Sequence, residues 1–308
     1  VIEHTVDGKV HTWRLHAEQA GVMQEPDMPP LRAFVPRLAL AEPAHWDDIA
    51  DTYTQALAGL APLNEAQSTR ARQLVEEGGA AAIHHDVARG LRRIPVPHRH
   101  YRLVPHAAQE NLERGMANEL DKNYTYYKLL EGAGIECAFA LVRSRAEGPL
   151  PKEAPSLRAF DRSAVYLMDE QRFTHAADDT LGFETLPGAL QGGTALVFAK
   201  DGACFHEIPL TDPEQESDRT RFEAALYPDG ALDLDLTYTG VGAAAAQLRG
   251  MKDLDEQQLR NQLESIVGRI HPAAKLEEYH VNDLADLAVV PKVQMQCTIP
   301  GYAVRAGE

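Results

Sequence analysis

Hydrophobic residues along this chain alternate between helical and strand-like spacing, and the changes in spacing predict its elements. In 44–57, Trp46, Ile49 and Leu57 recur at the roughly three- to four-residue spacing of one helix face. The same argument predicts helices at 65–77, 80–92, 106–114 and 253–270, and another that follows a polar turn at 117–122 and stops at Gly132 and Gly134.

Other segments carry the apolar patterns of strands. The segment 135–145 has the near-continuous apolar character of a central strand, and 219–240 is typical of a hairpin around the turn 227–230. Strands are also predicted at 163–168, 195–199, 204–208, 275–282 and 290–299, with an alternating stretch at 8–19 and an extended one at 26–43. Helices followed by antiparallel strands predict an α+β fold.

The pattern also predicts the domain organisation. A length of 308 residues favours about two domains. The strand-like stretch 1–43 is followed by predicted helices, and near Asp212 the pattern changes again, to one rich in strands. We therefore expect the end of an upstream β domain at 1–43, a core at 44–211 and a β-rich domain at 212–308.

Composition narrows the classes of function. Asp and Glu outnumber Lys and Arg by 46 to 30, for a formal charge of −16, which disfavours nucleic acid as a partner. The arginines at 89, 92, 93, 99 and 102 form a local basic cluster, which we interpret as a solvated face. No apolar run approaches the roughly 18 residues that a membrane span needs.

The three cysteines do not form a recognised motif. Cys137, Cys204 and Cys297 are widely separated and lack a CxxC pair, which excludes a zinc knuckle or dithiol redox motif. Two states of the cysteines are compatible with the sequence. Either two of them form a disulfide and one thiol remains, or all three thiols are free. The chain begins at Val1 rather than Met, so we expect it to derive from a longer precursor.

The segment from Asp121 to Arg145, DKNYTYYKLLEGAGIECAFALVRSR, resembles the central helix and following strand of bacterial transglutaminase-like proteins. Their pattern is G-D-C-K-D-K, a leucine-rich helix, then G-I and a strand. Asp121-Lys122 and Gly134-Ile135 match it at the same spacing. The segments DDTLGFETLPGALQGGTALVF and GALDLDLTYTGVGAAAAQLRG are similar to later passages of one large bacterial subgroup, and the N-terminal stretch resembles the tail of its preceding β-sandwich domain.

The resemblance implies a papain-like, transglutaminase-like core and a Cys-His-Asp triad, whose positions hold other residues here. The cysteine is expected two residues before Asp121, where Glu119 stands, and the histidine in F-[DN]-H, where Phe160-Asp161-Arg162 stands. The acid matches Asp178 or Asp179. Because arginine stays protonated, Arg162 cannot act as a base. We expect Glu119 and Arg162 to form a bidentate ion pair in place of the catalytic pair.

Three other groups of residues could form a functional site, and each also has a simpler structural interpretation. Glu119 with Asp178 or Asp179 would suit the two carboxylates of a glycoside hydrolase, but acids at a helix start are more often a cap or an ion pair. His98 and His100 are weak metal-ligand candidates, with His106 nearby, on what we interpret as a surface arm. Tyr101, Tyr124, Tyr126 and Tyr127 would stack on sugars in a cleft, but we favour core positions for the aromatics of the central helix.

The sequence therefore predicts a catalytically inactive transglutaminase-like protein that needs no cofactor or metal. Its role would be that of a binding or assembly component of the bacterial envelope or exterior, periplasmic or secreted, with a protein partner or self-assembly and with space for a carbohydrate or peptide ligand. The main alternative is a hydrolase, carbohydrate-active in one version, that uses carboxylates in the remodelled cleft. A misaligned, active cysteine enzyme is the third possibility.

Overall fold

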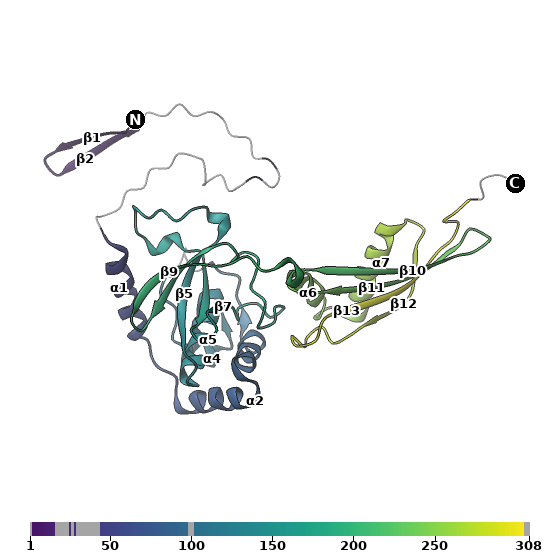
Figure 1. The fold of residues 1–308 in the computed structure, drawn as a ribbon, viewed down its shortest axis with the longest axis horizontal. Helices are drawn as coiled ribbons and strands as arrows, with labels where there is room; N and C mark the ends of the chain where they lie inside the picture. Colours follow the sequence, from purple (N-terminus) through teal and green to yellow (C-terminus); the bar gives the residue numbers. More distant parts are fainter. Residues whose placement is uncertain (1, 16–24, 26–27, 29–43, 98–101, 305–308) are drawn as a thin grey trace.

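The computed structural model describes residues 2–15, 25, 28, 44–97 and 102–304, and shows a mixed α+β fold with several antiparallel sheets (Figure 1). The predicted extended stretch 26–43 lies almost wholly outside the described residues, as do His98, His100 and Tyr101. At the N-terminus, β1 (Ile2–Asp7) and β2 (Val10–Leu15) form an antiparallel hairpin.

Two sheets dominate the fold. The core sheet has the strand order β7-β6-β5-β8-β9, and the C-terminal sheet has the order β10-β11-β13-β12; every neighbouring pair is antiparallel. The core strands are β5 (Cys137–Arg143), β6 (Arg162–Leu167), β7 (Arg172–Thr174), β8 (Thr194–Ala199) and β9 (Gly202–Glu207). The pattern missed β7, because it contributes only three residues.

The helices of the core begin with α1 (Trp46–Ala58) and α2 (Glu65–Gly90), followed by α4 (Ala108–Arg114) and α5 (Glu119–Gly132). The sequence predicted two helices in this region, at 65–77 and 80–92. Helix α2 spans both, but its backbone is non-helical at Gly78 and Gly79, which divides it into the two predicted pieces. Gly79 takes a φ of +65°, which glycine adopts without the penalty that other residues face. The second piece ends at Gly90, and Arg92–Arg93 form the short strand β3, which pairs in parallel with β4 (Met116–Ala117).

Helix α5 lies at the centre of the core. One side packs on α2 and β6 through Tyr126, Leu129 and Leu130, and another packs on α1, β5 and β8 through Leu120 and Tyr124. The core positions predicted for the aromatics of this helix are therefore confirmed. The opposite face of the sheet is rich in alanine, which lets the loop around Leu190 pack closely on it.

The C-terminal sheet carries its own hydrophobic core. Its strands are β10 (Asp218–Leu226), β11 (Leu232–Gly240), β12 (Lys275–Val281) and β13 (Lys292–Ile299). Helix α7 (Glu256–Ile270) buries Leu263 and Val267 against Leu236 and Met295. The predicted hairpin is confirmed, whereas α6 (Ala243–Arg249) was missed because a run of alanines gives no apolar periodicity.

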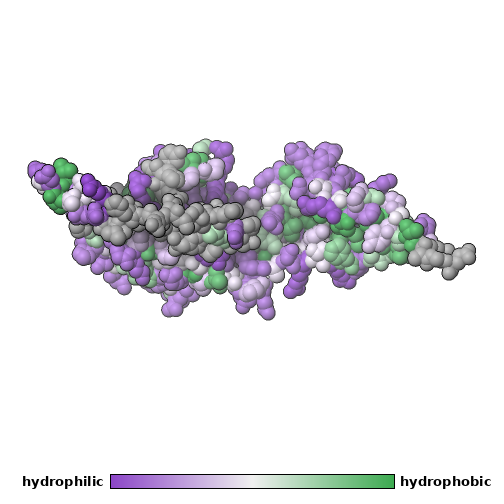
Figure 2. Space-filling view, turned by 90° about the horizontal axis from the view of Figure 1, so that it is seen from above, coloured by the Kyte–Doolittle hydropathy of each residue, from purple (hydrophilic) through white to green (hydrophobic). Residues whose placement is uncertain are grey.

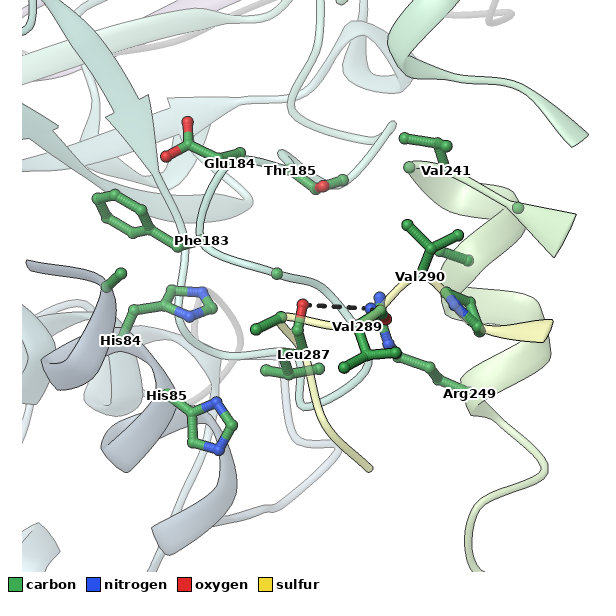
Figure 3. Close-up of a pocket in the computed structure, with 17 residues that line it drawn as sticks. His84, His85, Phe183, Glu184, Thr185, Val241, Arg249, Leu287, Val289 and Val290 are labelled. Atoms are coloured by element: carbon green, nitrogen blue, oxygen red, sulfur yellow. Dashed lines mark hydrogen bonds between the residues drawn. The ribbon is translucent and has the colours of Figure 1, made fainter. Parts of the chain in front are cut away.

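Side chains at the junction join the two sheet-containing parts. Arg249 of α6 is 5% exposed and donates to the backbone carbonyls of Thr180, Leu287 and Val289 at 3.2, 3.2 and 2.8 Å. Lys252 pairs with Asp179 at 2.9 Å. Figure 3 shows Arg249 reaching Leu287 beside a cavity of about 360 Å³ that His84, Phe183 and Val290 help to line.

Candidate functional site

Three strand or helix termini bring the candidate site together at the start of α5. Asn118 caps this helix by accepting a hydrogen bond from the Asp121 backbone N–H at 2.9 Å, so Glu119 is its first residue. Arg162 begins β6, and His175 directly follows β7. Because α5, β6 and β7 pack in succession, the three residues meet although 43 residues separate Glu119 from Arg162.

The predicted ion pair between Glu119 and Arg162 is present. Arg162 Nη1 donates to Glu119 Oε2 at 2.9 Å. The expected bidentate geometry is wrong, because Glu119 Oε1 turns to Ser163, whose backbone N–H donates to it at 3.3 Å, and lies 3.9 Å from His175 Nε2. The Glu119 side chain is only 11% exposed, so each of these contacts acts in a largely desolvated environment.

Arg93 adds a second guanidinium that the sequence did not place here. Its Nη2 lies 3.4 Å from Glu119 Oε2, and its Nη1 lies 3.8 Å from Asp178 Oδ2. The parallel pairing of β3 with β4 sets Arg93 opposite Ala117, two residues before α5 begins. The Arg93 side chain is still 41% exposed, as expected for a solvated face, but its contacts with Glu119 and Asp178 were not predicted, because a two-residue strand is too short to be seen in a pattern.

The two acids considered as triad members take different positions. Asp178 contacts the site through Arg93, and it also accepts hydrogen bonds from the backbone N–H and hydroxyl of Thr180. Asp179 points to Lys252 at the junction. The residue beside Glu119 is His175, which the sequence reasoning missed because the pattern D-x-T drew attention to the aspartates three and four residues later.

Asn123 fixes the spacing of the site. From the second turn of α5 it donates to the Ser163 carbonyl at 3.0 Å and accepts from the Ala176 backbone N–H at 3.0 Å. One buried amide therefore holds β6 and the end of β7 against the helix. His84 adds a further contact from α2, because its Nε2 hydrogen-bonds the His175 carbonyl at 3.0 Å.

The electrostatics of the site favour fixed charges. Burial by itself raises the pKa of Glu119, but His175 and Arg162 outweigh burial and lower the pKa to about 2. Burial also opposes ionisation of Asp178, and its Thr180 hydrogen bonds, His175 and Arg93 together lower the pKa below the usual range. A general acid must carry a proton near neutral pH, and neither carboxylate does.

A cavity of about 400 Å³ opens beside this network. Arg93, Glu119 and Arg162 line one side of it, and the segment Ile94–Pro97, Ser144, Ala146, Glu147, Asp161 and Ala189 line the rest. His175 is 3% exposed and is not among the lining residues, so the imidazole does not reach a ligand in the cavity. Paired guanidiniums and carboxylates around an open space suit binding of a polar ligand better than proton transfer.

The cysteines do not contribute to the site. All three thiols are free, so the alternative with one disulfide is wrong. Cys137 contacts the Tyr127 carbonyl, and burial raises the pKa of its thiol to about 12. Burial likewise raises the pKa of the exposed Cys204 thiol and that of Cys297, the latter to about 11. A nucleophilic cysteine needs the opposite shift.

The part of the chain that the structure describes holds no candidate metal cluster and no membrane-spanning helix. Within it, no group of three or more His, Cys, Asp or Glu side chains is placed to hold a metal ion. The weak candidates His98 and His100 lie outside that part of the chain, while His106 contacts Asp121 through Nδ1 at 3.0 Å. In the same residues, no helix combines the length and apolarity of a membrane span.

Comparisons with known proteins do not show a family for this chain. No family model matches the sequence, and no curated protein matches it. The chain is similar to a solved structure from Parabacteroides distasonis described as a "putative protease", with 14% sequence identity and a TM-score of 0.49 over 97% of this chain. The match spans 62% of the length of that protein. The helices and sheets of the chain itself define its class, an α+β protein with several antiparallel sheets.

Proposed function

We propose that this chain is a catalytically inactive protein with a transglutaminase-like core, and that it serves as a binding or assembly component of the bacterial envelope or exterior. One observation carries the proposal. Glu119, held by Arg162 and Arg93, occupies the helix start where that fold would place its nucleophile. The order of the site elements, a helix start followed by two neighbouring antiparallel strands, supports the same comparison.

The loss of catalysis follows from side-chain chemistry. A carboxylate with a pKa of about 2 that is paired with a guanidinium is a poor nucleophile and carries no proton to donate. Arg162 cannot take a proton from any group at physiological pH. His175, whose Nε2 lies 3.9 Å from Glu119 Oε1, is 3% exposed and is not among the residues that line the cavity.

The proposal includes the organisation inferred from the sequence. Residues 1–43 would be the tail of a β-sandwich domain, 44–211 the transglutaminase-like core and 212–308 a C-terminal β-rich domain. A periplasmic or extracellular location belongs to the same proposal. The cavity beside Glu119 would take a carbohydrate or peptide with polar groups that match Arg93 and Arg162.

The alternative of a hydrolase has weaker support. Its two acids would be Glu119 and Asp178, but Arg93 contacts both and stabilises both as anions. A glycoside hydrolase needs one of its carboxyls protonated. Glu119 lines the neighbouring cavity but Asp178 does not, so the two acids do not face a shared space there.

The first experiment tests for residual catalysis. The chain is incubated with a glutamine peptide and a fluorescent amine, with casein, and with polysaccharides, and its thiols are titrated with a fluorescent iodoacetamide. We expect no turnover and slow labelling confined to Cys204, which a Cys204→Ser variant abolishes. A fast-labelling cysteine, or turnover that Glu119→Gln abolishes, would overturn the proposal.

The second experiment tests for binding in the cavity. Arrays of envelope glycans and peptides are probed with the chain and with Ala189→Trp, which enlarges an exposed side chain that lines the cavity and takes no part in the ion pairs. Binding that the tryptophan removes supports the proposal. Binding that the tryptophan leaves unchanged places the ligand elsewhere and contradicts the cavity as its site.

A further inference from the structure

Strand β10 is an exposed and regular edge of the C-terminal sheet. All nine of its residues are exposed, and it pairs with β11 without a bulge from Asp218 to Leu226. The other edge, β12, is shorter, and its register shifts between Leu276 and Glu278. A bulge discourages pairing with another chain, whereas a long regular edge permits it.

The hydrogen-bond pattern tells which backbone groups of β10 are unpaired. Val241 N–H donates to the Ser217 carbonyl at 2.8 Å, and Tyr227 N–H donates to the Ala231 carbonyl at 2.8 Å. Both contacts continue the β10–β11 register, in which hydrogen-bonded and non-hydrogen-bonded pairs alternate. Odd-numbered residues therefore direct their backbone groups to β11, and the even-numbered residues direct theirs outward.

The two faces of β10 differ in chemistry. Phe222 pairs with Leu236, and Leu226 pairs with Leu232. Phe222 and Leu226 therefore lie on the same face of the sheet as the core that α7 covers. They remain 56% and 59% exposed. The opposite face of the strand carries Arg221 and Glu223, which form an ion pair with each other. Figure 2, seen from the side on which β10 lies in Figure 1, shows green apolar surface among purple along this part of the molecule.

We propose that β10 pairs with β10 of a second copy of this chain, antiparallel and about a two-fold axis at Phe222, so that the two C-terminal sheets become one. In this register the outward-facing Thr220 lies opposite Ala224 of the other copy, and Phe222 lies opposite itself. Every outward backbone group from Asp218 to Leu226 then meets an outward group. The interface is isologous, as closed dimers require.

Charge complementarity selects this partner and this register. Arg221 of each copy lies directly opposite Glu223 of the other, so two cross-strand ion pairs form on one face. Moving the axis to Thr220 would place Arg219 opposite Arg221, and moving it to Ala224 would place Glu223 opposite Ala225. Charges on a free edge ordinarily discourage pairing, but here their order along the strand is self-complementary.

The inference does not rest on the loss of catalysis, because β10 contributes no residue to the cavity beside Glu119. It would hold for an enzyme and for a binding protein alike. The apolar face of the paired strands would continue the hydrophobic cores beneath the two α7 helices, and burying Phe222 and Leu226 on that face would add a hydrophobic contribution.

Sedimentation velocity over a range of concentrations tests the proposal with the 308-residue chain and five variants. Arg221→Glu and Glu223→Arg each replace two opposite-charge pairs by like-charge pairs, and should raise the dimer dissociation constant about tenfold or more. The double variant Arg221→Glu/Glu223→Arg restores both pairs and should restore the dimer. Lys275→Glu makes the same charge change on the exposed β12 edge and should leave the dimer unchanged. Ala224→Pro removes an outward N–H for which the described residues of the same chain offer no acceptor, and should abolish pairing.

The outcomes separate the explanations. A dimer weakened by each single charge reversal and recovered in the double variant supports the proposal. A chain that stays monomeric at its highest soluble concentration overturns it, as does a dimer insensitive to Arg221→Glu. A monomer that binds an unrelated extended peptide through β10 also overturns it, and assigns the edge to a different partner. Circular dichroism of every variant confirms that the sheet is folded.

Discussion

Arg162 Nη1 lies 2.9 Å from Glu119 Oε2, and this ion pair connects the first residue of β6 to the first residue of α5. Both groups sit where a helix start and a strand start converge, which is a common place for catalytic residues. Here the two groups neutralise each other as an ion pair, and Arg93 contacts the same carboxylate oxygen. The site is therefore one of fixed charges rather than of transferable protons.

Breaking the ion pair should destabilise the core moderately. We expect Arg162→Met to lower the free energy of unfolding by about 1–2 kcal/mol, less than the roughly 3–5 kcal/mol seen for fully buried pairs. The reason is that the Arg162 side chain is 38% exposed and Arg93 still faces the carboxylate. Urea titration of Arg162→Met, Glu119→Gln and the double variant measures the coupling, and strictly additive losses would contradict a direct interaction.

Glu119 should make the protein sensitive to acid. Its pKa falls from 4.5 in the unfolded chain to about 2 in the folded protein, so between these values the unfolded state binds more protons. Stability is then fully present above pH 4.5 and is lost as pH falls through 2, by on the order of 3 kcal/mol. Chemical denaturation of wild type and Glu119→Gln at several pH values checks this, and equal slopes between pH 4.5 and 2 would refute it.

His84 should act over a higher pH range. Burial, opposed by its hydrogen bond to the His175 carbonyl, lowers the pKa of His84 from 6.5 to about 4. The unfolded chain takes up this proton first, so stability falls as pH drops from 6.5 to 4, by on the order of 3 kcal/mol. His84→Gln keeps a donor near the Nε2 position and should flatten the profile in this range. A slope between pH 6.5 and 4 that is the same in wild type and His84→Gln would contradict the assignment to His84.

Arg249 should hold the junction together. Replacing it with Met removes the donors to the carbonyls of Thr180, Leu287 and Val289, and we expect a loss of about 2 kcal/mol or more. Arg249→Lys retains the charge with fewer hydrogen-bond donors, so its stability should fall between that of wild type and that of Arg249→Met. Hydrogen exchange at 286–290 should accelerate in Arg249→Met, and unchanged protection there would show that the guanidinium is not the main connection.

The sequence predicted most regular elements because each carries a local periodic signal. The helix that Glu119 begins, the buried strand at Cys137–Arg143 and the hairpin at 219–240 are confirmed close to their predicted bounds. The short strands β3 and β7 and the alanine-rich α6 were missed, because they are formed by tertiary contacts rather than by their own patterns. The domain boundaries and the transglutaminase-like core remain predictions.

The candidate site was predicted only in part for the same reason. Spacing and resemblance brought Glu119 and Arg162 together, and the ion pair between them is confirmed. They did not indicate Arg93, which a two-residue strand positions, or His175, which the end of β7 places 3.9 Å from Glu119. They also gave no basis for separating Asp178, which reaches the site, from Asp179, which pairs with Lys252.

The sequence alone determined which chemical groups this protein has: a carboxylate at a helix start, no cysteine near it and an acidic overall charge. Tertiary structure decided which of those groups meet and in what protonation state. The fold buries Glu119 between two guanidiniums and an imidazole, which fixes its charge, and it places β10 at the edge of its sheet, which exposes a self-complementary edge. Local pattern specifies elements, whereas burial and long-range contact set pKa values and unpaired edges.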